Sequence, residues 1–129
     1  IPLRMHARTA GVGICPRGRH PEGHLRHNMI HDVPTNLGRA GSNGFFIDEG
    51  SSELTLTGNV VHSIACSPVR FHMAGPCRLE GNTLVRTESV ASFRYDGCDP
   101  EVMTLTGNLH PISPPWRPPQ SPPFEVGPR

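Results

Sequence analysis

Short segments in which apolar and polar residues alternate recur along this chain at a nearly constant interval. Aligning three of them gives two columns of apolar residues spaced 24 apart, namely Phe45, Val69, Phe93 and Ile47, Phe71, Tyr95. Val12 and Ile14 are weaker counterparts nearer the start of the chain. One apolar residue in two is typical of a strand that buries one face. Repeated at a fixed period, this pattern predicts a β-solenoid in which each coil buries its apolar face against the next.

A second phrase, a leucine three residues before an asparagine, occurs four times. The pairs are Leu25/Asn28, Leu56/Asn59, Leu79/Asn82 and Leu105/Asn108. Asparagine suits a tight corner between strands, and stacked asparagines can hydrogen-bond to one another through their side chains. Each pair therefore marks a corner, and we expect about four coils. A β-sandwich also has regularly spaced strands, but it does not require apolar columns in a fixed register.

Composition narrows the class of protein further. The 129 residues include 14 Gly and 15 Pro, which argues against long helices. A formal net charge of +1 gives no electrostatic reason to expect nucleic acid or an anionic membrane as a partner. No apolar run approaches the roughly 18 residues that a membrane-spanning helix needs. We therefore expect no nucleic-acid partner and no membrane partner, and the sequence does not predict the oligomeric state.

The chain divides into three parts by pattern. Residues 1–10 show neither strand alternation nor a helical pattern, and we expect an irregular segment there. Residues 11–110 carry the repeats and form the predicted all-β domain. Residues 111–129 contain eight prolines, which removes backbone donors and favours an extended, solvated chain, so we expect a disordered tail.

The outward positions of the repeats carry the candidate chemistry. Asp48, His72 and Asp96 follow the second apolar column at the same 24-residue period, and Phe46, Arg70 and Arg94 form the preceding outward column. Neighbouring parallel strands lie about 4.8 Å apart, so the two aspartates should be roughly 9 to 10 Å apart on either side of His72. Alternatively, outward charged residues on adjacent strands form an ordinary surface ion-pair ladder, which contributes little to stability.

Three stretches of the sequence resemble a known family. They read NGFFIDEGSSELTLTGNVV (43–61), FHMAGPCRLEGNTLV (71–85) and HLRHNMIHDV (24–33). They resemble right-handed parallel β-helix proteins of the pectate-lyase-like superfamily, and more narrowly its bacterial β-helix glycoside hydrolases, over about residues 11–110. Members are several times longer, so the resemblance implies a fragment of a secreted or cell-surface protein. A departure is that His72 stands where relatives have a segment rich in His and Tyr.

The resemblance implies an enzyme that hydrolyses glycosidic bonds in a polysaccharide or oligosaccharide without a cofactor. Two carboxylates about 6.5 to 9.5 Å apart leave room for the attacking water of an inverting enzyme. Asp48 would be the base, Asp96 or Glu49 the general acid, and His72 would orient or protonate a substrate oxygen. Arg70 and Arg94 would bind hydroxyls or a uronate carboxylate, beside Phe46 as an aromatic platform.

Two other functions stay open. A uronate lyase would use Arg70 or Arg94 as its base and calcium bound by Asp48, Glu49 and Asp96. A non-catalytic solenoid, such as an adhesin, would bind glycans without turnover. A metal site built from the clustered histidines between 20 and 31 is not expected, because His24 and His27 would face opposite sides of a strand and no cysteine has a suitable spacing.

Overall fold

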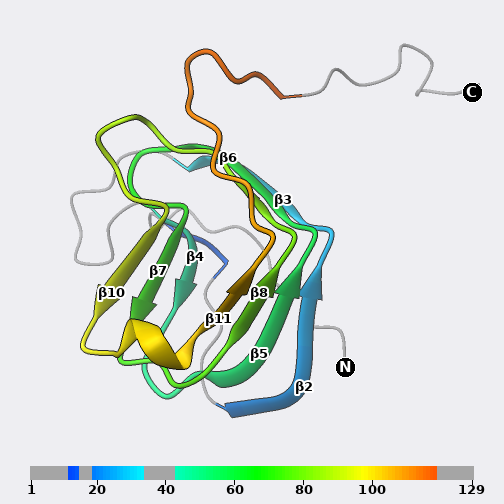
Figure 1. The fold of residues 1–129 in the computed structure, drawn as a ribbon, viewed down its shortest axis with the longest axis vertical. Helices are drawn as coiled ribbons and strands as arrows, with labels where there is room; N and C mark the ends of the chain where they lie inside the picture. Colours follow the sequence, from blue (N-terminus) through cyan, green and yellow to red (C-terminus); the bar gives the residue numbers. More distant parts are fainter. Residues whose placement is uncertain (1–11, 15–18, 34–42, 119–129) are drawn as a thin grey trace, which may run out of the picture.

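The computed structural model describes residues 12–14, 19–33 and 43–118 (Figure 1). In these ranges the chain forms eleven strands and one short 3-10 helix, so the expected all-β class is confirmed. The strands are β1 (Val12–Ile14), β2 (Arg19–Arg26), β3 (Met29–Val33), β4 (Asn43–Ile47), β5 (Ser52–Thr57), β6 (Val60–Ile64), β7 (Val69–His72), β8 (Arg78–Glu80), β9 (Thr83–Leu84), β10 (Phe93–Asp96) and β11 (Thr104–Thr106), and the helix is η1 (Pro100–Val102). Nowhere in the described ranges is a helix long and apolar enough to cross a membrane.

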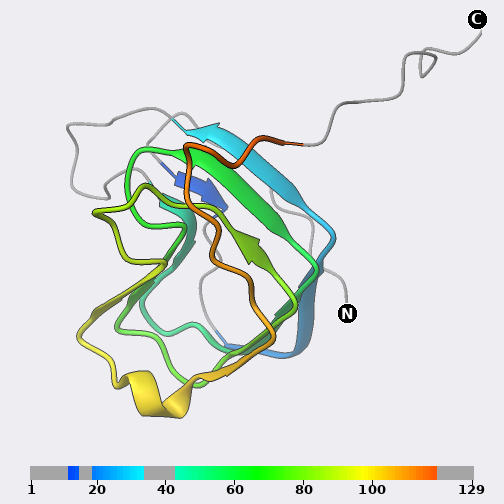
Figure 2. The ribbon, with the colours of Figure 1, turned by 45° about the horizontal axis from the view of Figure 1, so that its top comes forward.

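The strands form three parallel sheets. Their orders are β1-β4-β7-β10, β2-β5-β8-β11 and β3-β6-β9. Three consecutive strands thus contribute one strand to each sheet, and the next three lie beside them in the same order (Figures 1 and 2). After β9 the third sheet continues as single bridges from Thr83 to Leu109 and from Arg86 to Ile112. This arrangement is compatible with a β-helix.

The predicted register holds in the first sheet. Phe45 pairs with Val69 and Val69 with Phe93, while Ile47, Phe71 and Tyr95 pair in the same way. In the preceding strand Ile14, and not Val12, pairs with Phe45. The register there differs by two residues from the simple alignment, and a shift of two keeps each residue on the same face of the strand. Because side chains alternate between the faces of a strand, an error of one residue would have turned every column to the opposite face.

The core lies between the three sheets. The leucines of the second phrase form one column, in which Leu25, Leu56 and Leu79 are fully buried and Leu105, on the outermost strand, is 38% exposed. On the first sheet Phe71 stacks on Tyr95 with ring centroids 5.2 Å apart. Fully burying one such side chain is worth about 1.5 to 3 kcal/mol, so these columns supply most of the packing energy that holds successive repeats together.

The asparagines of the second phrase form a hydrogen-bonded ladder at the corner between the second and third sheets. The side-chain Oδ1 of Asn59 accepts from the backbone N–H and the Nδ2 of Asn28, at 2.9 and 3.0 Å. Asn82 accepts from Asn59 in the same manner, and Asn108 accepts from Asn82. The second Nδ2 hydrogen of each acceptor reaches a leucine carbonyl of the preceding repeat. The buried polar groups at this corner are therefore satisfied, as they must be away from water.

The structure describes only part of the chain at its two ends. Residues 1–11 and 119–129 lie outside the described residues, so the predicted irregular segment 1–10 falls there entirely and the predicted tail 111–129 falls there from residue 119 onward. Residues 111–118 are described, and Trp116 packs on the ring of His62 with centroids 5.3 Å apart. The same His62 ring is stacked on His31, at 5.1 Å and nearly parallel. These rings lie on the outer side of the third sheet.

Candidate functional site

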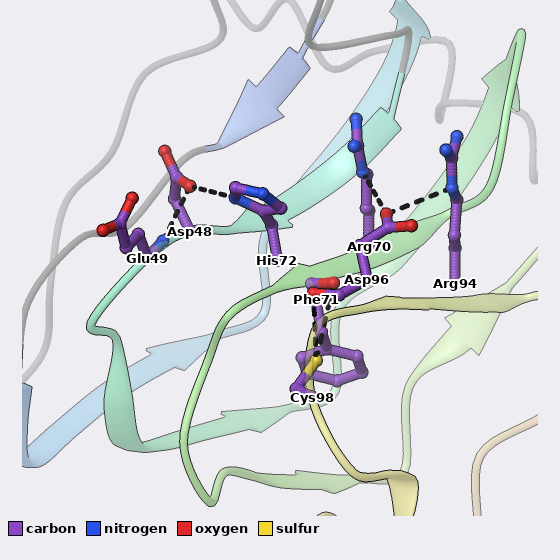
Figure 3. A network of polar contacts seen from close by, with 8 residues as sticks. All are labelled: Asp48, Glu49, Arg70, Phe71, His72, Arg94, Asp96 and Cys98. Atoms are coloured by element: carbon purple, nitrogen blue, oxygen red, sulfur yellow. Dashed lines mark hydrogen bonds and ion pairs between the residues drawn. The ribbon is translucent and has the colours of Figure 1, made fainter.

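The candidate site is the outer face of β4, β7 and β10, where the two predicted outward columns lie (Figure 3). The register places Phe46 beside Arg70, Arg70 beside Arg94, and His72 beside Asp96. Asp48 follows the last residue of β4 and contacts His72. The periodicity therefore brought the predicted residues onto neighbouring strands, with their side chains on the face that points away from the core.

Asp48 and His72 form one pair within this face. The Oδ1 of Asp48 lies 3.0 Å from the Nδ1 of His72 and also accepts the backbone N–H of Glu49 at 2.6 Å. Asp48 is nearly buried, at 8% exposure, whereas Glu49 beside it is exposed. When the carboxylate accepts Nδ1–H, the tautomer of the ring is fixed and its Nε2 is left as the nitrogen that can exchange a proton with a ligand.

Asp96 belongs to a second cluster. Its Oδ2 accepts the Nε–H of Arg70 at 2.7 Å and forms an ion pair with the Nε of Arg94 at 3.1 Å. Burial by itself raises the pKa of Asp96, but the hydrogen bond from Arg70 and the charges of both arginines outweigh it, so that the pKa lies below the usual value of 3.8. Asp96 is consequently ionised at neutral pH.

The expected Asp-His-Asp column is thus divided between two clusters. Asp48 binds His72, while Asp96 binds the arginines that lie two residues earlier on β7 and β10 (Figure 3). Charged guanidinium groups make stronger hydrogen bonds to a carboxylate than neutral partners do. This explains why Asp96 contacts Arg70 and Arg94 and not the imidazole of His72.

Phe46 lies beneath the arginines. It is 8% exposed, and the guanidinium carbon of Arg70 sits 4.9 Å from the centre of its ring. The ring also approaches His72, with centroids 6.1 Å apart. In this position Phe46 supports Arg70 through a cation–π contact, and little of its ring faces solvent.

Sequence reasoning did not single out Met73, which follows His72 directly. It is 52% exposed and has a positive φ of 52°, which is uncommon for a residue other than glycine. The strand pattern of β7 ends at His72, so alternation said nothing about the next side chain. The only signal in the sequence is its place in the 24-residue period, which aligns Met73 with Glu49 and Gly97.

In the described part of the chain, no group of three or more His, Cys, Asp or Glu side chains lies close enough together to hold a metal ion. An open hollow of about 590 Å³ lies over the third sheet and the segment that follows β11, lined by apolar residues that include Val60, Leu109 and Trp116. It carries no carboxylate and lies on a different sheet from the Asp48–His72 pair.

The chain matches no protein-family model, no curated protein and no solved structure. The relation to pectate-lyase-like β-helix proteins thus remains a resemblance of short sequence stretches. What the structure adds to it is a strand-rich fold with parallel sheets.

Proposed function

We propose that this chain is part of a secreted or cell-surface right-handed parallel β-helix protein of about four coils, which binds a polysaccharide and hydrolyses its glycosidic bonds. Three parallel sheets that each gain one strand per repeat support the β-helix. Crossover connections between parallel strands are right-handed in about 98% of cases, which supports that hand. A polysaccharide is too large to enter a cell, which supports a location outside it.

The observation that carries the proposed activity is the alignment of the Asp48–His72 pair with the Arg70–Asp96–Arg94 cluster on one outward face. Hydrolysis needs one group that takes a proton from water and another that gives a proton to the leaving oxygen. The Asp48–His72 pair is suited to the first task, since its imidazole has an oriented, exchangeable nitrogen.

Glu49 is the candidate for the second task, because it is the other carboxyl group that lies directly beside the Asp48–His72 pair. Asp96 is less suited to it, since its contacts with two arginines stabilise its ionised form and lower its pKa. In the proposed reaction, water oxygen bonds to the anomeric carbon and its proton passes to His72. The glycosidic oxygen leaves with the proton of Glu49. Asp96 instead orients Arg70 and Arg94 toward sugar hydroxyls or a uronate carboxylate.

The lyase alternative has less support. It requires an arginine that acts as a base, whereas Arg70 donates its Nε–H to Asp96 and Arg94 is ion-paired with the same carboxylate oxygen. Non-catalytic glycan binding is the second candidate. The mutual pairing of all these charges favours it, since ion pairs of this kind also occur on surfaces without catalytic function.

The test is turnover of a panel of neutral and uronate polysaccharides, followed as new reducing ends. We expect wild-type activity and a loss of about 100-fold or more in Asp48→Asn, because Asp48 orients the His72 imidazole that takes the proton from water, and general-base catalysis usually contributes a factor of this size. Glu80→Gln is the matched control, because Glu80 pairs with Arg78 on β8, away from the site, and should retain activity.

Each other outcome points elsewhere. Retained activity in Asp48→Asn would contradict the assignment of the Asp48–His72 pair as the general base. Products with an unsaturated-sugar absorbance would favour the lyase. Glycan binding without turnover in the wild type would favour the non-catalytic solenoid.

A further inference from the structure

Met73 occupies a position that a glycine would fill with less strain. Its φ of 52° lies in the left-handed region, where a Cβ atom crowds the following carbonyl oxygen. The equivalent position of the next repeat is Gly97, with a φ of 68°. Two neighbouring repeats therefore have left-handed backbone at this corner, one with glycine and one with a long apolar residue, whereas the positive φ of the preceding repeat lies at Gly50.

Backbone hydrogen bonds fix this equivalence. The N–H of Met73 donates to the carbonyl of Asp96 at 2.8 Å, and the N–H of Gly50 donates to the carbonyl of Met73 at 3.3 Å. The first sheet's bonding pattern thus continues one residue beyond β7. Glu49, Met73 and Gly97 form the next column after Asp48, His72 and Asp96, at the end of the candidate site.

The side chain of Met73 lies across Gly97. A Cβ atom added to Gly97 would come within 3.0 Å of the Met73 Cγ, so the absence of a side chain there leaves room for the methionine. Met73 is not part of the buried core cluster and is more than half exposed. Among the described residues, positive φ values also occur at four others that are not glycine, namely His27, Asp32, Glu53 and Ser63. What distinguishes Met73 is a large exposed apolar side chain directly after His72.

The location of Met73 indicates what it contacts. Five large apolar side chains are exposed in the described part of the chain, and of these Met73 adjoins the Asp48–His72 pair; the others are Met29, Val102, Leu105 and Leu109. Phe46, the aromatic residue of the same face, is covered by Arg70. A sugar bound at the pair would therefore meet Met73 as its apolar neighbour.

We propose that Met73 is a specificity-determining residue of the candidate carbohydrate site, where its thioether packs against the C–H face of a pyranose ring held beside Asp48 and His72. The proposal rests on the proposed function. A polarisable, unbranched side chain adapts to an irregular apolar surface. Arg70 and Arg94 lie on the other side of the pair and bind the polar edge of the same glycan. Met73 would select sugars with a continuous C–H face.

The test is calorimetric titration of the full chain with neutral and uronate oligosaccharides, together with thermal unfolding. Met73→Gly should weaken binding about 5- to 10-fold, the effect of losing a contact of one or two methylene groups. Its unfolding midpoint should stay the same or rise, because relief of backbone strain opposes the greater freedom of glycine in the unfolded chain. Met73→Leu should bind within about twofold of wild type, since it keeps the apolar contact.

Met29→Ala is the matched control, because Met29 is an equally exposed methionine on β3, remote from the site, and its removal should leave affinity unchanged. Unchanged affinity in Met73→Gly would overturn the role of Met73 and leave the proposed function standing. A lower unfolding midpoint that accompanies weaker binding in Met73→Gly would also overturn it, since that result indicates a structural role. A wild-type chain that binds no oligosaccharide would overturn both proposals.

Discussion

Asp96 binds two arginines on the outward face of the first sheet. One of its oxygens accepts a hydrogen bond from Arg70 and forms an ion pair with Arg94, and these contacts lower its pKa although burial opposes the shift. The carboxylate and the two guanidinium groups thus position one another. At this scale the role of Asp96 is to fix Arg70 and Arg94 for contact with a ligand.

Asp96→Asn should destabilise the protein by about 1 to 2 kcal/mol at pH 7, a charge-assisted hydrogen bond discounted for partial exposure. Because the folded state favours the ionised form, the wild type has this advantage above the ordinary aspartate pKa of 3.8 and loses it as pH falls through the lower folded pKa. The difference between the two proteins in urea denaturation should therefore vanish in acid.

The control for this prediction is Asp32→Asn. Asp32 pairs with His31 on the third sheet, but its side chain is largely exposed, so its replacement should change stability little at either pH. A difference between wild type and Asp96→Asn that persists unchanged in acid would show that Asp96 acts by packing and not by charge.

The asparagine ladder repeats the same hydrogen bonds at the corner of each successive repeat. Asn59 and Asn82 are buried, and each both accepts from the previous asparagine and donates to the next. The same side chains cap leucine carbonyls of the neighbouring repeat. The corner therefore transmits register from one repeat to the next, independently of the apolar columns.

Asn59→Ala should destabilise the protein by about 2 to 4 kcal/mol, because it leaves at least two buried groups, the N–H of Asn28 and the carbonyl of Leu25, without their partners. Asn108→Ala should cost about 1 kcal/mol, since Asn108 ends the ladder and is only partly buried. Equilibrium denaturation in urea compares the two. Equal losses would contradict a ladder whose strength depends on burial.

Over the whole molecule, the parts that sequence could predict are those set by period. The 24-residue spacing of Phe45, Val69 and Phe93 predicted the strand pairing, because a fixed period on parallel strands keeps equivalent residues together. The same argument put the candidate residues on one face. The assignment to a right-handed β-helix of a particular family is not tested by these columns and stays a proposal.

What the sequence could not predict depends on competition between neighbours. Both His72 and the two arginines were within reach of Asp96, and only side-chain geometry shows that it binds the arginines and not His72. Phe46 alternated correctly, yet the arginine that covers it comes from the next repeat. The left-handed backbone of Met73 could not be predicted, because a methionine does not indicate this conformation. At the equivalent corner of the next repeat the residue is Gly97, a type that favours it.

The central claim is that ligands bind the outward face of β4, β7 and β10, and backbone amide NMR of the full chain during titration with neutral and uronate oligosaccharides tests it most directly. We expect chemical-shift changes concentrated at Glu49, His72, Met73 and Arg94, and none at Trp116 over the third sheet. Changes centred on Trp116, or no changes with any sugar of the panel, would contradict it.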